Sequence, residues 1–405
     1  MSQGSPRLSR SASLIRAGVF AELAPRIDAQ ARLGADLIGL HIGDSYRAPP
    51  AAARFALLEP GQVPDTELYR YGNVVGLDRL RESLVAQLAA RRHGPRSVDP
   101  ASQVLIGCGA THALFCASRA ILEAGDEVLV AAPYWPLAVG VVRAAGATPV
   151  EVSTTTRLYA DPALDVSSLF EKALTPRTRA IYFATPGNPD GKVLTATQLA
   201  SVARFAIAHD LWVIADEVYA DYVYEGDHVS IAGFDEMANR TLSVYSLSKS
   251  CALAGVRVGF VVGPEHVISV ARRLATHTVF NVPVAAQRVA LAALSSSAEW
   301  IDEARREYRS VRDATVRALR DAGVSAPVPE GGSYVFADFA PLLKGRSLRE
   351  LLEAAIDRGV LLAPGDGFGQ DFSSWARICF TVAPPSRVLE GIERLKETLV
   401  HFASK

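Results

Sequence analysis

Five short stretches of the 405-residue chain carry side chains that could do chemistry. In VYSLSKSCALAGVRVG (residues 244–259), Lys249 lies among serines and small apolar residues, and Arg257 follows eight positions later. Lysine is among the residues least often buried, so an amine in such a segment needs a reason. A partly desolvated amine can be neutral and nucleophilic, and Ser246, Ser248 and Arg257 add two hydroxyls and a guanidinium to the same stretch.

Three further stretches add groups of complementary chemistry. In ADEVYADY, Asp216 ends an apolar run and Tyr219 follows three residues later. A carboxylate at that place is costly unless a cation meets it. PGNPDGK places Asn188 in a turn, and ARICFTVA carries Arg377 at the start of a strand-like run. Taken singly, each residue also has an ordinary explanation as a helix cap, core aromatic, turn residue or solvated charge.

The fifth stretch, VLIGCGATHALF, passes from an apolar run through glycines into a helical pattern. The spacing of Gly107 and Gly109 fits the dinucleotide-binding fingerprint, but the third small residue of that fingerprint falls on His112. The stretch also lacks the Gly-Lys-Ser/Thr ending of a phosphate-binding loop. What remains is a helix that begins at Gly109, Ala110 and Thr111, whose free amides can hold one phosphate. The alternative is a plain strand-to-helix turn.

Seven β-branched runs predict the strands that must position these groups. They cover residues 103–106, 127–130, 148–152, 179–184, 212–216, 242–246 and 259–262. Helical patterns lie between several of them, which predicts an α/β domain with a mostly parallel seven-stranded sheet flanked by helices. Ligands bind at the carboxyl ends of such strands, where these groups gather. Together they suit one ligand with a phosphate, an aldehyde and a basic ring nitrogen, which is pyridoxal 5'-phosphate.

The pattern changes after about residue 295. An amphipathic segment over 297–322 predicts a long connecting helix, and it is followed by strand-like runs at 333–338 and 376–382 with a helical pattern at 348–358 between them. We therefore predict a large cofactor-binding domain over 48–295. A smaller α+β domain is expected from both chain termini, over 1–47 and 296–405, with an N-terminal arm over about 1–20.

The composition narrows the function classes. Hydrophobic residues make up 49% and charged residues 21%, and the net charge of -1 gives no reason to expect a nucleic-acid partner. No apolar run reaches the roughly 18 residues that a membrane helix needs. The four cysteines lack the close pairing of zinc or dithiol sites, so no metal is expected. The Ser/Arg-rich first twenty residues suit a disordered arm or a transit peptide; without an apolar signal core we expect the cytoplasm.

The motifs, in their order along most of the chain, resemble the class I/II aminotransferases of the aspartate aminotransferase superfamily, fold type I. The motifs that carry this resemblance are HIGDSYRAPP (41–50), YGNVVGLDRLRESL (71–84), GATHALF, PYWP (133–136), PGNPDGK, ADEVYADY, SLSKSCALAGVRVG, GGSYVF (331–336), APGDGFG (363–369) and ARICFTVA. The resemblance implies a pyridoxal phosphate-dependent enzyme that moves an amino group from an L-amino acid to a 2-oxo acid. It also implies a ping-pong mechanism through a Lys249 Schiff base, and a homodimer with shared active sites.

The resemblance further implies a role for each site residue. Lys249 would bind the cofactor aldehyde and carry the proton of the substrate Cα, and Asp216 would keep the pyridine nitrogen protonated. Tyr219 and Asn188 would hydrogen-bond the phenolic oxygen, and Trp135 would stack on the ring. The phosphate would be held by Gly109, Ala110, Thr111, Ser246, Ser248, Arg257 and, from the neighbouring subunit, Tyr71. The substrate would be held by Arg377 at its α-carboxylate, with Asn188, Gly43 and Tyr46.

The chain departs from the family pattern at the substrate end. The usual Gly-x-Pro-x is here Gly43-Asp44-Ser45-Tyr46, so Tyr46 and the following Arg47 are candidates for changing specificity, although a solvated Arg47 is the alternative. Some aspartate-preferring relatives carry lysine where this chain has Thr111. Near the expected site for a distal carboxylate, the chain offers His277 and Asn281 but no arginine before Arg288. We therefore expect a neutral or aromatic amino donor, with 2-oxoglutarate as acceptor.

Two other functions compete. A lyase of the same fold, of the C-S β-lyase or aminocyclopropane-carboxylate synthase type, would keep the same site residues. A regulatory protein would use the fold to sense an effector, but the stretch before His41 leaves no room for the DNA-binding domain of such proteins.

Overall fold

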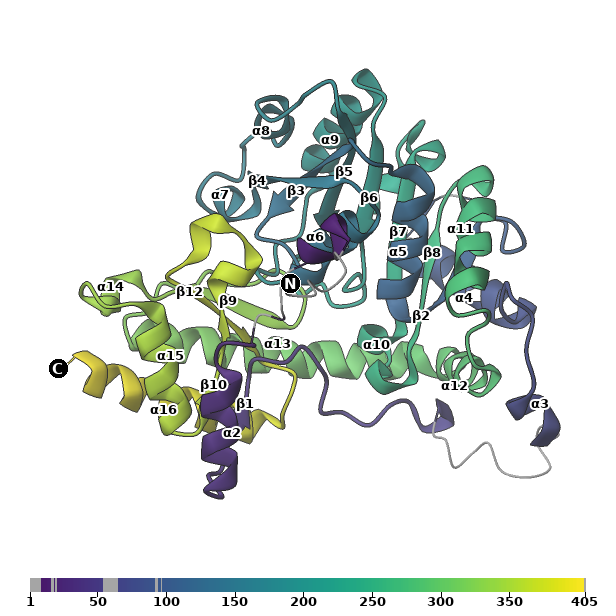
Figure 1. The fold of residues 1–405 in the computed structure, drawn as a ribbon. Coiled ribbons are helices and arrows are strands. Elements are labelled where there is room, and N and C mark those ends of the chain that lie inside the picture. Colours follow the sequence, from purple (N-terminus) through teal and green to yellow (C-terminus); the bar gives the residue numbers. More distant parts are fainter. Residues whose placement is uncertain are drawn as a thin grey trace, which may run out of the picture.

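A computed structural model describes residues 9–15, 18, 20–53, 65–91, 94–95 and 97–403, and its largest sheet has seven strands (Figure 1). The strands are β2 (Val104–Cys108), β3 (Glu127–Ala132), β4 (Thr148–Ser153), β5 (Thr178–Ala184), β6 (Trp212–Asp216), β7 (Thr241–Ser246) and β8 (Val258–Val262). Their order is β2-β8-β7-β6-β5-β3-β4. Strand β8 runs antiparallel to both neighbours, and the other pairs are parallel. The predicted fold class is therefore confirmed.

Helices cover both faces of this sheet, because successive side chains of a strand point to opposite faces and most strands carry buried apolar residues on both. In β3, Val128 and Val130 pack into the cluster under α5 (Gly109–Ile121), α6 (Pro136–Ala144) and α11 (Glu265–Thr278). Leu129 and Ala131 face the opposite side, toward a second cluster. That side is covered by α8 (Ser167–Glu171), α9 (Ala196–Ala208), α4 (Asp78–Arg91) and α12 (Val284–Leu294).

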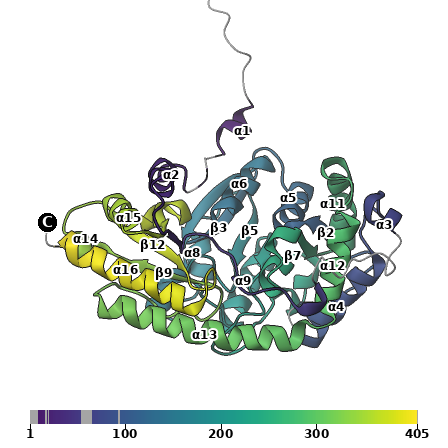
Figure 2. The same cartoon turned by 90° about the horizontal axis from the view of Figure 1, so that it is seen from below.

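A long helix, α13 (Ser297–Asp321), runs from the large sheet to a group of smaller sheets (Figure 2). Its predicted apolar stripe is buried at Ile301, Ala304, Tyr308 and Val311. The smaller sheets are β11-β12-β9, with β9 (Tyr334–Asp338), β11 (Ala363–Pro364) and β12 (Trp375–Cys379) antiparallel, and the parallel pair of β1 (Ile38–Gly39) with β10 (Val360–Leu361). The β1–β10 pair brings the N-terminal segment beside the C-terminal part of the chain. The domain boundaries at 48 and 296 stay a prediction.

The remaining helices are short or lie near the ends of the chain. They are α1 (Arg10–Ser13), α2 (Ala24–Arg32), α3 (Asp65–Tyr69), α7 (Thr155–Ala160), α10 (Leu247–Ser250), α14 (Ala340–Leu343), α15 (Leu348–Asp357) and α16 (Pro385–Ala403). Helix α15 begins at a capping box, in which Ser347 and Glu350 satisfy each other's backbone amides. The predicted arm at 1–20 lies partly outside the described residues. Within the described part, no helix has the length and apolarity to span a bilayer.

Candidate active site

A cavity of about 380 Å³ lies where the predicted site residues converge, at the carboxyl ends of the parallel strands. Its lining comes from the ends of β5, β6 and β7, the start of α5, the smaller sheet and the segment after β1. The lining residues are Ile42, Gly43, Asp44, Ala110, Thr111, Leu114, Trp135, Ala184, Asn188, Asp216, Val218, Tyr219, Val244, Ser246, Ser248, Lys249, Ala254, Arg257, Tyr334 and Arg377. A larger and more open hollow of about 1080 Å³ lies elsewhere and contains none of the predicted site residues.

Lys249 lies on α10, the short helix that begins where β7 ends. Ser246 caps this helix by accepting a hydrogen bond from the Ser248 amide at 3.3 Å, so the chain turns sharply and directs the lysine into the cavity. The Lys249 Nζ donates to the carbonyl oxygen of Gly43 at 2.7 Å. The Lys249 side chain therefore extends across the cavity, from the end of β7 in the large sheet to the segment after β1.

Asp216 ends β6 as a buried carboxylate with an exposed fraction of 5%. Tyr182, on the neighbouring strand β5, donates a hydrogen bond to its Oδ2 at 2.7 Å. Burial raises the pKa of Asp216 to about 6, an effect that the Tyr182 hydrogen bond partly offsets. A cation at this place would favour the ionised form, and a protonated pyridine nitrogen is such a cation.

The start of α5 sits unusually close to the sheet because two paired glycines lie beneath it. Gly107 of β2 and Gly259 of β8 are opposite each other in the register. A Cβ on Gly107 would lie 2.7 Å from the Ala113 nitrogen, and one on Gly259 would lie 2.7 Å from the Ala110 Cα. The glycines therefore let the free amides at the helix start reach the cavity rim, which is the arrangement that binds a phosphate.

Arg257 completes this end of the cavity. Gly109 has φ of +75°, and a Cβ there would overlap the Arg257 guanidinium. The Gly109 amide donates to the Arg257 carbonyl at 2.8 Å, and the Arg257 side chain lines the cavity with Thr111, Ser246 and Ser248. One guanidinium, three hydroxyls and free amides at the positive end of a helix suit a dianionic phosphate.

Arg377 and Asn188 meet at the opposite end of the cavity, from β12 and from the loop after β5. The Arg377 Nη1 donates to Asn188 Oδ1 at 3.0 Å, and its Nη2 donates to the His41 carbonyl at 2.6 Å. The Arg377 Nε is buried and has no hydrogen-bond partner among the described residues. A buried, partly unsatisfied guanidinium is a receptor for a carboxylate. The donor set of the cavity therefore fits pyridoxal phosphate together with an amino acid.

Three predicted site residues lie outside the cavity lining. Gly109 has no side chain to reach the cavity, but its positive φ and its lack of a Cβ allow α5 to begin beside Arg257. Tyr71 is exposed over 85% of its surface and packs edge to face on Phe280, with ring centroids 4.9 Å apart. The Tyr46 hydroxyl donates to Glu307 on α13, so the structure does not bring this side chain to the cavity.

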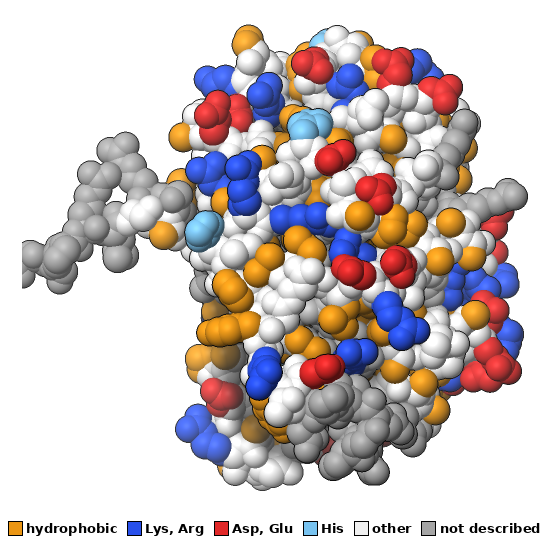
Figure 3. All heavy atoms as spheres, turned by 90° about the vertical axis from the view of Figure 1, so that its right-hand side faces the viewer, with side chains coloured by type: hydrophobic (Ala, Val, Ile, Leu, Met, Phe, Trp, Pro, Cys, Tyr) orange, Lys and Arg blue, Asp and Glu red, His pale blue; other side chains and the backbone are white. Residues whose placement is uncertain are grey.

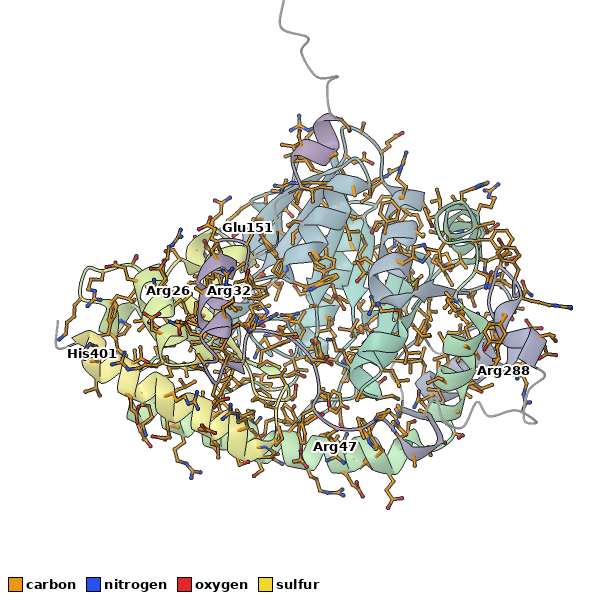
Figure 4. All side chains as sticks on the ribbon, turned by 60° about the horizontal axis from the view of Figure 1, so that its bottom comes forward. Arg26, Arg32, Arg47, Glu151, Arg288 and His401 are labelled. Carbon is orange, nitrogen blue, oxygen red and sulfur yellow. The ribbon has the colours of Figure 1, made fainter. Side chains whose placement is uncertain are left out.

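The segment after β1, which we call the strap (residues 43–48), is fastened to α13. Beside the Tyr46 contact, Arg47 Nη1 donates to Glu307 Oε2 at 2.8 Å, and Ser45 Oγ lies 2.6 Å from the Tyr308 hydroxyl. The Arg47 guanidinium also lies 5.4 Å from the centroid of the Trp300 ring. Figure 4 shows Arg47 against α13. The Arg47 side chain is 18% exposed, and these contacts turn it toward α13 and away from the cavity.

Sequence reasoning missed two tyrosines of the site. Tyr182 is the hydrogen-bond donor to Asp216, and Tyr334 lines the cavity with its hydroxyl 2.6 Å from that of Tyr219. A tyrosine inside a strand needs a partner for its hydroxyl when buried, which was a usable signal for both. Which partner it takes depends on strand register, which the sequence did not provide.

Comparisons with known proteins agree with this geometry. The family model described as aminotransferase class I and II matches residues 35–395. The chain is 33% identical over 371 residues to aromatic-amino-acid aminotransferase 2 of Thermococcus litoralis, covering 90% of this chain and 92% of that protein. It is 33% identical, over an alignment of 417 residues, to an aspartate aminotransferase of Streptomyces avermitilis, covering 98% of this chain and 99% of that protein.

A solved structure gives the same result. The aspartate aminotransferase of Thermus thermophilus with maleate superposes with a TM-score of 0.86 at 29% identity, covering 97% of this chain and 100% of that one. The matches extend over both the large sheet and the smaller sheets. This chain therefore belongs to the class I and II aminotransferases, the pyridoxal phosphate-dependent transferases of fold type I.

Proposed function

We propose that the protein transfers the amino group of a neutral or aromatic L-amino acid to a 2-oxo acid by a ping-pong mechanism. The observation that carries the proposal is the convergence of Lys249, Asp216 and Arg377 on one cavity of about 380 Å³. Lys249 would hold the cofactor covalently, Arg377 would hold the substrate, and both half-reactions would use the same site in turn.

The side chains divide the work at the reacting centre. When bound, pyridoxal phosphate supplies an aldehyde that takes up the amino group and a protonated ring that draws electrons from the substrate Cα. Asp216 would keep that ring protonated through a buried ion pair. Lys249 would remove the Cα proton and return one as a general acid and base, for which its reach into the cavity suits it. Tyr219 and Asn188 would donate hydrogen bonds to the phenolic oxygen.

Substrate orientation would come from the Arg377 end. A fork of two N–H groups matches a carboxylate in one plane, and the buried Nε supplies a donor that the described residues leave unused. Asn188 fixes the guanidinium from the large sheet, and the Gly43 backbone would contact the carboxylate from the strap. Fixing the α-carboxylate holds the Cα proton toward Lys249 and keeps water away from it.

The amino donor is inferred from the cations of the cavity. Among the described lining residues, these are Lys249, Arg257 and Arg377, and each has a role toward the cofactor or the α-carboxylate. Arg47 is bound to Glu307. No cation of this lining remains for a second carboxylate, whereas Ile42, Leu114, Trp135, Val218 and Tyr334 offer apolar contacts. A dicarboxylate, aspartate as much as 2-oxoglutarate, would need a cation from a partner subunit.

The test is an absorbance scan of the holoenzyme during stepwise addition of single amino acids, without a keto acid. A true donor should convert the cofactor band, and adding pyruvate or 2-oxoglutarate afterwards should restore it. Phenylalanine, tyrosine, leucine and methionine should act at lower concentrations than aspartate. Conversion by aspartate alone would refute the proposed donor, while pyruvate and ammonia from a cysteine-type substrate would indicate a lyase. Lys249→Ala should lose turnover.

We also propose a homodimer that completes the site. Tyr69 and Tyr71 are 87% and 85% exposed, and Tyr71 packs on Phe280, which is itself 44% exposed. Figure 3 shows this side of the molecule, where apolar side chains lie between basic and acidic ones. Aromatic side chains exposed to this extent are typical of interfaces. Tyr71→Ala should lower cofactor affinity in a dimer and have no such effect in a monomer, which light scattering distinguishes.

The cytoplasm stays the proposed compartment. Cys108, Cys116, Cys251 and Cys379 are all free thiols, as in proteins kept in reducing surroundings.

A further inference from the structure

Tyr334 lies where three parts of the active site meet. Its hydroxyl is 2.6 Å from the Tyr219 hydroxyl, and the two rings pack edge to face with centroids 5.7 Å apart. The Arg377 guanidinium lies 4.3 Å from the centroid of the Tyr334 ring. A Cβ on Gly43 would lie 2.9 Å from the Tyr334 Cζ, so the phenol end of the ring is in contact with the strap. Tyr334 is 2% exposed.

The backbone holds Tyr334 in this place from both sides. It begins β9, and the register pairs Tyr334 with Cys379 and Phe336 with Arg377. Tyr334 and Arg377 are therefore diagonal neighbours on one face of the sheet. Before Tyr334, the Gly331 amide donates to the Gly191 carbonyl at 2.9 Å and the Gly332 amide donates to the Tyr222 carbonyl at 2.8 Å. These bonds tie the start of β9 to the loop of Asn188 and to the segment of Tyr219.

The hydroxyl pair can be arranged in two ways, with different consequences. A phenol has one proton to donate, and among the described residues each of these hydroxyls has the other as its hydrogen-bond partner. If Tyr219 donates, its proton points at Tyr334 and is lost to the cofactor. If Tyr334 donates, the Tyr219 proton is free for the cavity, and two hydrogen bonds in series strengthen each other. Burial keeps the pKa of Tyr219 well above its usual range, so the proton is present.

We propose that Tyr334 is a positioning residue that donates its hydroxyl proton to Tyr219 and holds the Arg377 guanidinium on the face of its ring. The hydroxyl directs the Tyr219 proton toward the phenolic oxygen of the cofactor. The ring keeps the guanidinium in the plane where Asn188 and the substrate carboxylate meet it. The inference rests on the proposed function, because both consequences concern groups held in that site.

The first test is the pH titration of the visible absorbance of the holoenzyme, without substrate, in the wild type and in Tyr334→Phe. The midpoint of this titration falls as the hydrogen bond to the phenolic oxygen becomes stronger. Loss of the Tyr334 hydroxyl weakens the donation by Tyr219, so the midpoint should rise by about half a pKa unit to one unit. The matched control is Tyr222→Phe, which removes another buried hydroxyl, bonded to the Ser250 carbonyl at 3.3 Å and outside the cavity lining. Its midpoint should equal that of the wild type.

An unchanged midpoint in Tyr334→Phe would overturn the inference and leave the proposed function standing. A lowered midpoint would also overturn it, because that result means that Tyr219 donates to Tyr334. A wild-type holoenzyme without a titrating band would instead refute the attachment to Lys249, and the inference would fall with the proposed function.

The ring is tested separately from the hydroxyl. Tyr334→Phe keeps a ring under Arg377, so its affinity for 3-phenylpropionate, a carboxylate without an amino group, should stay within about twofold of the wild type. Tyr334→Leu removes the ring, and the affinity should fall by about 3- to 30-fold. Equal affinities in the two variants would overturn the role of the ring. Thermal unfolding of both variants shows whether the fold is kept.

Discussion

Replacing Gly259 by alanine tests whether the seat of α5 on the sheet makes the phosphate site. The new Cβ would lie 2.7 Å from the Ala110 Cα and 2.9 Å from the Gly109 carbonyl carbon. These are backbone atoms, so no side-chain rotation can relieve the overlap. Strand β8 and the first turn of α5 must separate, and the Ala110 and Thr111 amides must move with that turn.

The expected magnitude follows from these contacts. Overpacking of a buried position lowers the free energy of unfolding by about 1–3 kcal/mol. A hydrogen bond to a charged group contributes about 1.5–3 kcal/mol, so misaligning one amide at the phosphate should weaken pyridoxal phosphate binding by about 10- to 100-fold. Both quantities can be measured in the cofactor-free protein, by urea unfolding and by a titration with pyridoxal phosphate that follows quenching of tryptophan fluorescence.

Gly255→Ala is the matched control, four positions away in the same stretch. A Cβ on Gly255 would meet nothing within 4 Å, so stability should change by less than about 0.5 kcal/mol and affinity should be kept. If Gly259→Ala bound the cofactor as tightly as the wild type, the close seat of α5 would not be what forms the phosphate site. A loss of stability with full affinity would lead to the same conclusion.

Three further predictions concern buried or paired charges. Burial raises the pKa of Asp216 to about 6, so between about pH 4 and 6 the cofactor-free folded protein binds a proton at Asp216 that the unfolded chain releases. Relative to Asp216→Asn, the free energy of unfolding of the wild type should therefore fall by up to about 3 kcal/mol as pH rises from 4 to 7.5. Urea unfolding that gave the same difference between the two proteins at all pH values would contradict this. The Lys192 Nζ lies 2.6 Å from Glu330 Oε1, and the Lys192 side chain is only 5% exposed, so Glu330→Ala should lower the free energy of unfolding by about 3–5 kcal/mol. Adding Lys192→Met to this variant should recover most of that loss, whereas additive effects of the two substitutions would argue against a coupled pair. Glu307→Gln should loosen the strap and raise KM for the amino donor several-fold while changing stability by less than about 1 kcal/mol, whereas Glu303→Gln, at a longer and more exposed contact, should leave KM unchanged.

The sequence was enough to predict the large sheet and the grouping of most site residues. Most of its seven strands contain a buried apolar run between turn residues, which is a strong local signal. Strands β4 (TPVEVS) and β7 (TLSVYS) are mixed with polar residues. Asp216 ends one of the seven strands and Asn188 and Lys249 each follow one, and parallel strands bring their carboxyl ends to one edge. The convergence of these three residues could therefore be predicted from the parallel strands and from the resemblance to the class I/II aminotransferases.

Contacts between side chains far apart in the sequence could not be predicted in this way. Tyr46 was expected near the substrate, yet its hydroxyl bonds to Glu307, and Arg47 turns to the same carboxylate. The pairing of Tyr334 with Tyr219 depends on the register between β9 and β12 and on how the smaller sheet meets the large one. No local pattern encodes these directions, because both partners are fixed by packing of separate elements.

The place of β8 in the sheet bears on how the protein folds. Strand β8 lies between β2 and β7, so the amides at the start of α5 and the arginine that follows α10 become neighbours only when two distant parts of the chain pair. Closing such a long loop is entropically unfavourable and slow, while the parallel strands between them can form from nearer segments. We therefore expect the phosphate end of the cavity to be among the last parts to form, so that added cofactor accelerates no early refolding step and acts by trapping the completed sheet.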